Sequence, residues 1–217
     1  MGSVAASGEL PGWLRSPAPS REERAHALQP SHALTIRRRP ESTRALAEGL
    51  LLHALLQHLP GVAPERRAAT GERFLAAQAP DLGLHERTAV VAKATAVLNE
   101  SGAAPLFAEG SLAEVEIAAT VTLPGGRTAE VSGRIDRLVV AADEVRFCDF
   151  KTGAPPPSLE ATPRVYVTQA ALYHAVLSSL YPDRPVRAFL IWTEGPQVVE
   201  VPPAMLNKAL GAVPASP

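Results

Sequence analysis

Residues 133–153, GRIDRLVVAADEVRFCDFKTG, carry the most informative pattern in the chain. Their two apolar runs, separated by a short turn, predict two adjacent antiparallel strands. Side chains two positions apart on a strand share a face, so Asp149 and Lys151 are expected to point the same way. Asp136 lies on the neighbouring strand across the turn. We therefore expect the carboxylates of Asp136 and Asp149 to approach each other.

These residue types together indicate a phosphodiester-hydrolysing site. Two carboxylates that converge repel each other, and Mg²⁺ favours one or two carboxylates completed by water and substrate phosphate. Lys151 beside such a cation can activate the attacking water or stabilise negative charge on the phosphate. An alternative remains on the residue pattern alone, in which Asp149 and Lys151 form a surface ion pair at a sheet edge. Asp136 would then pair with Arg134 or Arg137.

Outward from this stretch, hydrophobic periodicity predicts helices first and a sheet later. The expected helices are 42–59, 64–79, 85–100, 162–179 and one from 203, and the expected strands are 112–123, 128–140, 144–151, 186–193 and 198–201. A three-stranded meander, a crossover helix and further strands indicate a mixed α/β sheet.

The expected organisation is one domain behind a flexible segment. Residues 1–41 contain several prolines and the triplet Arg37-Arg38-Arg39, which is either a solvated linker or a basic arm that touches phosphate. The domain then divides into a helical part at 42–101, a sheet core with a crossover helix at 104–201, and a terminal helix and tail at 202–217.

Residues 42–201 resemble the RecB-like branch of the PD-(D/E)XK nucleases. Four motifs of that branch are matched in order, namely G-x-x-x-H at 49–53, G-x-I-D-R at 133–137, D-[YF]-K-T-G at 149–153 and Y-x-x-Q-x-x-x-Y at 166–173. The resemblance implies a restriction-endonuclease-like mixed sheet flanked by helices, with an N-terminal helical segment.

The resemblance also implies roles for the matched residues. His53, Asp136 and Asp149 would bind the metal ion, together with the backbone carbonyl of Phe150. Asp136, Asp149 and Lys151 would be the catalytic residues, and Lys151 would activate water or stabilise the transition state. The implied cofactor is Mg²⁺, for which Mn²⁺ can substitute.

The crossover helix carries three supporting candidates. Gln169 and Tyr173 are four residues apart and share a helix face, and Tyr166 lies one turn earlier on the same side. The resemblance places this face against the DNA strand and the active site. In the alternative interpretation, the two tyrosines are core aromatics.

Glu114 is a further candidate metal ligand, because its strand lies where the branch often has an acidic residue. Its orientation, and that of Glu116, depends on the hairpin loop that follows. A two-residue turn would pair Val115 with Asp136 and point both glutamates away. A three-residue loop would instead pair one of the two glutamates with Asp136. The choice matters because a shift of one residue exchanges the faces of a strand.

More narrowly, the chain resembles the C-terminal nuclease domains of AddA-type helicase–nuclease subunits, which act in double-strand-break repair. Cys148 is the single cysteine, so an iron–sulfur cluster held by several cysteines, as in AddB-type relatives, is excluded. Because Cys148 alternates with Asp149, it is expected in the core. The sequence contains no G-x-x-x-x-G-K-[ST] phosphate loop. The resemblance therefore implies a helicase portion N-terminal to this chain, an AddB-type partner subunit, and single-stranded DNA.

Composition sets broader limits. The chain has 46% hydrophobic residues and a formal net charge of −1, which argues against a strongly basic nucleic-acid binder. A metal-dependent nuclease nevertheless concentrates acidic residues at its centre, so near neutrality is compatible with DNA. No run reaches the roughly 18 apolar residues of a membrane span, and a signal peptide is not expected. We expect a cytoplasmic setting without membrane association.

The sequence thus predicts an Mg²⁺-dependent DNA nuclease domain that cleaves single strands delivered by a helicase during break repair and recombination. Two other interpretations remain open. One is a catalytically inactive nuclease-fold domain that binds DNA or a partner subunit. The other is a phosphodiesterase that acts on a small nucleotide.

Overall fold

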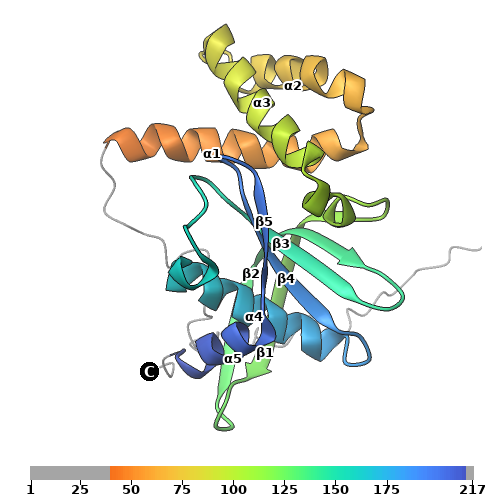
Figure 1. The fold of residues 1–217 in the computed structure, drawn as a ribbon, viewed down its shortest axis with the longest axis vertical. Helices are drawn as coiled ribbons and strands as arrows, with labels where there is room; N and C mark the ends of the chain where they lie inside the picture. Colours follow the sequence, from red (N-terminus) through yellow and green to blue (C-terminus); the bar gives the residue numbers. More distant parts are fainter. Residues whose placement is uncertain (1–39, 214–217) are drawn as a thin grey trace, which may run out of the picture.

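One five-stranded sheet, covered by helices on both faces, forms the body of the computed structural model (Figure 1). The structure describes the backbone of residues 40–213 and the side chains of residues 45–213. The strands are β1 (Leu112–Thr122), β2 (Thr128–Val140), β3 (Val145–Lys151), β4 (Val186–Trp192) and β5 (Gln197–Val201). The α-helices are α1 (Pro40–His58), α2 (Pro64–Gln78), α3 (Leu84–Asn99), α4 (Arg164–Leu180) and α5 (Pro203–Gly211). Short 3₁₀ turns are η3 (Leu59–Gly61), η4 (Ser101–Leu106) and η5 (Leu159–Ala161).

The predicted mixed α/β fold is confirmed, and the expected elements agree with the observed ones within a few residues. The first helix begins at Pro40, two residues before the expected start. Most of the expected 1–41 linker, including the arginine triplet, lies outside the described residues. Within residues 40–213, none of the helices combines the length and the hydropathy that a membrane span requires.

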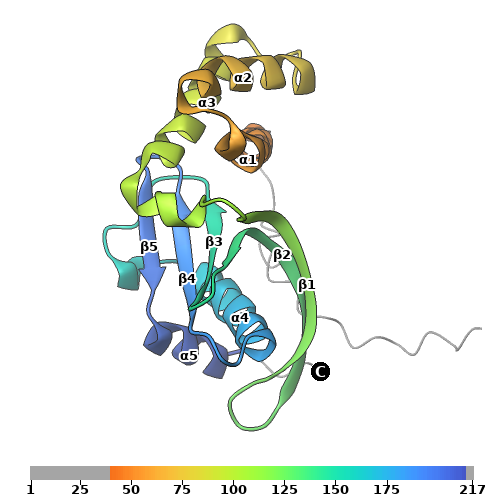
Figure 2. The same cartoon turned by 90° about the vertical axis from the view of Figure 1, so that its right-hand side faces the viewer.

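The strand order is β1-β2-β3-β4-β5, and β3 is the central strand. β1, β2 and β3 form an antiparallel meander, β3 and β4 are parallel, and β5 returns antiparallel to β4. Parallel neighbours require a crossover connection, which α4 supplies. Figure 2 shows α4 running along one face of the sheet. The helices α1, α2 and α3 lie together at the top of that view, and α5 lies near the bottom.

Two separate cores form on the two faces of the sheet, because side chains alternate along β3. Phe147 packs with α4 and α5, whereas Cys148 and Phe150 pack with α1, α2 and α3. Strands covered on both faces read as nearly continuous apolar runs, as β3 and β4 do. The expectation that Cys148 lies in the core is confirmed, and burial raises the pKa of its thiol well above the ordinary value. A thiol with a raised pKa is a poor nucleophile.

A three-residue loop connects β1 and β2, so the two-residue alternative is wrong. Leu123 N–H donates to the carbonyl of Arg127 at 2.7 Å, and the glycines between them have φ values of 84° and 77°. Glycine occupies such left-handed positions without steric cost. The register pairs Val115 with Ile135. One step further along both strands, Glu114 lies opposite Asp136.

Gly133 is required where β2 passes under α4. A Cβ at Gly133 would lie 2.4 Å from the hydroxyl oxygen of the fully buried Tyr173. We expect Gly133→Ala to lower the free energy of unfolding by about 1–3 kcal/mol, the usual cost of overpacking. Chemical denaturation measures the change.

Gly211→Ala is the matched control, because no atom lies within 4 Å of its added Cβ. We expect this variant to unfold as the wild type does. Tyr173→Phe in the Gly133→Ala background should recover part of the loss by removing the nearest atom. Equal stabilities of Gly133→Ala and wild type would contradict this account of the packing.

Candidate active site

Asp136 and Asp149 meet where β2 and β3 separate. Arg137 pairs with Cys148, so the next step along both strands brings Asp136 opposite Asp149. The Phe150 N–H donates a 2.6 Å hydrogen bond to Oδ2 of Asp136, and this bond takes the place of a strand-to-strand bond. Burial and the charge of Asp136 raise the pKa of Asp149 to about 6, although nearby cations oppose the shift. The two carboxylates therefore form a compact acidic centre, as expected from the sequence.

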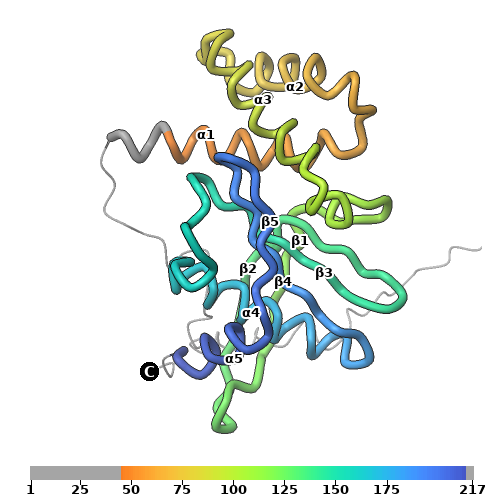
Figure 3. Tube along the Cα trace, in the orientation of Figure 1, coloured from red at the N-terminus to blue at the C-terminus, as the bar shows by residue number. Residues whose placement is uncertain are grey.

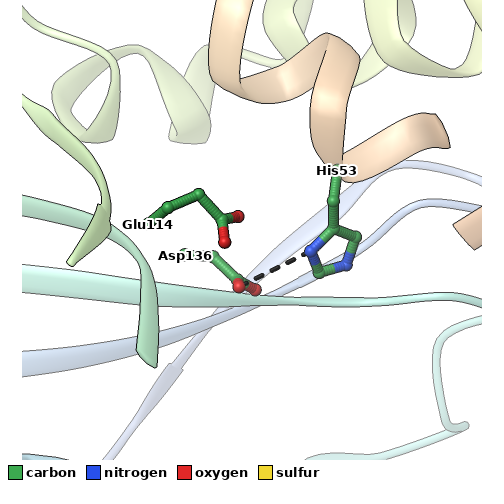
Figure 4. Close-up of side chains that lie close together, drawn as sticks. All are labelled: His53, Glu114 and Asp136. Atoms are coloured by element: carbon green, nitrogen blue, oxygen red, sulfur yellow. Dashed lines mark ion pairs between the residues drawn. The ribbon is translucent and has the colours of Figure 1, made fainter. Parts of the chain in front are cut away.

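His53 reaches this centre from α1. Gly49 allows the helix to approach the end of β3, since its Cβ would lie 3.0 Å from the methyl carbon of Thr152. One turn further along α1, Nδ1 of His53 lies 3.5 Å from Oδ1 of Asp136 (Figure 4). The His53 ring also packs edge-on against Phe150 at a centroid distance of 5.3 Å. The spacing of glycine and histidine thus places the imidazole over Asp136.

Glu114 joins His53 and Asp136 in a group of three donors. One ligand atom from each lies within 4.8 Å of the others, and Figure 4 shows the three side chains converging from three elements. Burial lowers the pKa of His53, but its hydrogen bond to Asp136 and the surrounding carboxylates raise it more, so the pKa lies above the ordinary value. One imidazole nitrogen and two carboxylates form a donor set that fits a divalent cation.

Glu114 is held by two features that sequence reasoning missed. Its backbone φ is 54°, a left-handed conformation that residues other than glycine rarely adopt. Its Oε2 also lies 2.8 Å from Nε of Arg134 on the neighbouring strand. One alternative left open by the sequence was an ion pair between Asp136 and Arg134. In the structure, Arg134 pairs with Glu114 instead.

Lys151 lies beside the three donors in a buried polar setting. Its Nζ forms an ion pair with Asp149, donates a 2.8 Å hydrogen bond to Oε1 of Gln169, and lies 4.2 Å from the ring centroid of Tyr166. Lys151 is only 6% exposed, and its strand is the central one. The pair of Asp149 and Lys151 is therefore no surface pair at a sheet edge.

Tyr173 orients Gln169 from the core. The Gln169 amide nitrogen donates to the Tyr173 hydroxyl at 3.4 Å, which leaves the amide oxygen directed at Lys151. The same hydroxyl accepts a 3.3 Å hydrogen bond from the backbone N–H of Arg134. Tyr173 is fully buried, so its effect on the site passes through Gln169.

The carbonyl of Phe150 is turned toward the acidic centre by strand geometry. The Lys151 carbonyl accepts a bond from the Thr193 N–H, on the β4 side. Successive carbonyls of a strand point to opposite neighbours, so the Phe150 carbonyl faces β2, which carries Asp136. No residue pattern signals the contact between the Phe150 N–H and Asp136, because every non-proline residue has a backbone amide.

Except for the buried Tyr173, the candidate site residues line one open groove of about 1030 Å³, which we call the active-site groove. One wall of the groove is α1 and the other is the β1–β2 hairpin. In Figure 3, α1 crosses the upper part of the view, and the turn of the hairpin lies at the bottom. Its lining includes His53, Glu114, Asp136, Asp149, Lys151, Tyr166 and Gln169.

Comparison with protein families agrees with the fold. The sequence pattern of the PD-(D/E)XK nuclease superfamily matches residues 23–210. The chain belongs to the PD-(D/E)XK nuclease superfamily. No curated protein gives a significant match. The solved structure titled "Crystal structure of SSO0001" is 16% identical, with a TM-score of 0.31, and the match covers 75% of this chain and 83% of that one.

The donor set predicts that divalent cations stabilise the protein. At a concentration 100 times the dissociation constant, Mg²⁺ or Mn²⁺ should raise Tm by roughly 5–10 °C, which corresponds to about 2.7 kcal/mol. Asp136→Asn should remove most of this shift while still accepting the hydrogen bond from the Phe150 N–H. Differential scanning fluorimetry measures both effects.

Asp143→Asn is the matched control, since Asp143 is exposed in the β2–β3 turn. Its metal-induced shift should equal that of the wild type. An undiminished shift in Asp136→Asn would place the cation elsewhere.

The pKa shifts predict how the metal effect depends on pH. Asp149 has a pKa of about 6, and the pKa of His53 is raised, so both hold protons at higher pH than usual. Protons compete with a metal ion for these groups. The metal-induced rise in Tm should therefore shrink as the pH falls from about 8 to about 5.5. At each pH, the quantity to compare is the difference between Tm with metal and Tm without metal. Carboxylates that titrate elsewhere in the protein affect both values equally, so their effect is removed from the difference. A constant difference would contradict the involvement of these groups.

Proposed function

We propose that this chain is a divalent-metal-dependent DNA nuclease domain, with Mg²⁺ as its metal. The observation that carries the proposal is a buried lysine, paired with a carboxylate, beside a three-donor group at the floor of an open groove. His53, Glu114, Asp136, Asp149 and the Phe150 carbonyl are the groups proposed to hold the cation. A bound cation would supply Lewis-acid stabilisation of the charge that develops on the scissile phosphate.

The chain's own residues prepare the reaction. Asp149 and Gln169 fix the Lys151 ammonium, so it needs little rearrangement to donate a hydrogen bond to a phosphate oxygen or to a water molecule. The hydrogen bond from the Phe150 N–H holds Asp136 in one orientation. Burial makes each of these electrostatic interactions stronger than it would be in water.

The motifs quoted above support a more specific context. We propose that the chain is an AddA-type, RecB-like nuclease domain at 42–217, which a linker at 1–41 joins to a helicase. In this proposal, the helicase delivers single-stranded DNA during double-strand-break repair, an AddB-type subunit is the partner, and the setting is the cytoplasm.

The decisive test is cleavage of a labelled single-stranded oligonucleotide with Mg²⁺ or Mn²⁺. We expect Lys151→Met and Asp149→Asn each to lower the rate by about 100- to 1000-fold, the loss typical when one preorganised electrostatic group is removed. Lys208→Ala, an exposed lysine on α5, is the matched control and should cleave as the wild type does.

Thermal unfolding of each variant separates loss of chemistry from loss of fold. If the folded wild type bound metal and DNA without cleaving, the chain would be an inactive binding domain. If dinucleotides were cleaved in preference to long strands, it would be a small-nucleotide phosphodiesterase. If Lys151→Met and Asp149→Asn retained full activity, the site would be wrong.

A further inference from the structure

The helix α1 has two apolar faces, and only one of them belongs to a core. Leu52, Leu55 and Leu56 are buried against the neighbouring helices and β3. Leu46 and Leu50 lie one turn apart on another face and are 41% and 64% exposed. Because the helix already has a core face, packing does not require these two leucines to be apolar.

Leu46 and Leu50 line the active-site groove, together with Ala54. The three residues recur every four positions and form one stripe along the helix. His53 stands on the same helix, so the stripe runs along the approach to the three-donor group. We call Leu46, Leu50 and Ala54 the apolar wall.

The opposite side of the groove carries charged and polar side chains, including one exposed cation. Ser132, Arg134 and Glu116 lie there on β1 and β2, beside Ile117 and Ala118. The Arg134 side chain is 60% exposed, whereas its backbone N–H donates a hydrogen bond to the Tyr173 hydroxyl. The backbone position of Arg134 is therefore fixed, and its guanidinium is accessible from the groove. Its partner Glu114 belongs to the three-donor group. A phosphate in the groove can therefore contact Arg134 close to the reacting centre.

This asymmetry matches one form of nucleic acid. A strand has charged phosphates on one side and flat apolar base faces on the other, but in a duplex the bases are stacked inside. Only a single strand can present phosphates to Arg134 and bases to an apolar wall at the same time. Duplex DNA would set charged phosphates against leucines.

We propose that Leu46 and Leu50 contact the bases of a DNA single strand, while Arg134 binds a phosphate next to the scissile one. This inference rests on the proposed nuclease function and deepens it. In this proposal the groove itself selects single strands, with no contribution from a separate motor. The contacts do not read base identity, since every base has an apolar face.

The test compares binding to two fluorescein-labelled strands of about 12 nucleotides, a length within the usual range of single-strand sites. One strand is oligothymidylate and the other has abasic sites in place of the bases. Fluorescence anisotropy is measured with the full chain in Ca²⁺, so that binding is separated from cleavage. We expect the wild type to bind the base-bearing strand roughly tenfold more tightly than the abasic strand.

Leu46→Ser/Leu50→Ser should bind both strands with the weaker affinity. Leu84→Ser/Leu180→Ser is the matched control, since these leucines are 66% and 59% exposed and lie outside the groove lining. This control should keep the wild-type preference. Arg134→Gln should also keep the preference for bases, but should reduce the salt dependence of binding by about one phosphate contact.

Wild-type binding that does not distinguish the two strands overturns the proposal, as does an unchanged preference in Leu46→Ser/Leu50→Ser. A change of oligomeric state in that variant, seen by sedimentation with unaltered DNA binding, would assign the apolar wall to a second copy of the chain. The proposed nuclease function is contradicted by a different result, namely that the wild type does not cleave DNA with Mg²⁺ or Mn²⁺. Because the binding assay in Ca²⁺ does not depend on cleavage, it tests the contacts of Leu46 and Leu50 whether or not the chain cleaves DNA.

Discussion

Three elements of the site are positioned relative to one another by their contacts with Asp136. Its carboxylate accepts the hydrogen bond of the Phe150 N–H, lies 3.5 Å from His53, and belongs to the three-donor group with Glu114. Each contact comes from a different element, namely β3, α1 and β1. A shift of β2 by one residue would turn Asp136 to the other face and dismantle all of them.

Stability and chemistry oppose each other at this centre. Burial, and then repulsion from the carboxylate of Asp136, raise the pKa of Asp149, so ionising both groups at this place costs free energy. Lys151 offsets part of the repulsion, and Gln169 with Tyr173 keeps the lysine in place. The cores on the two faces of the sheet supply the stability that tolerates this arrangement.

Local periodicity predicted the elements well because most of the strands and helices have clear apolar patterns. β2 was expected at 128–140 and is observed at Thr128–Val140, and the shared face of Asp149 and Lys151 follows from alternation alone. Glu114 could not be placed in this way. Its position depends on whether two or three residues form the β1–β2 loop, and the glycine pair is compatible with both.

The amino-acid sequence alone predicts the order of the elements, the residues that share a face of each strand, and the set of acidic, basic and imidazole groups available for chemistry. These follow from periods of two and 3.6 residues, which are properties of a single element. The folded structure was needed to show that Glu114 lies near Asp136, that Arg134 pairs with Glu114, and that Leu46 and Leu50 border the groove. These contacts depend on loop geometry and on the close approach of α1 to the end of β3 at Gly49. The hydrophobic period of a single helix or strand predicts neither of them.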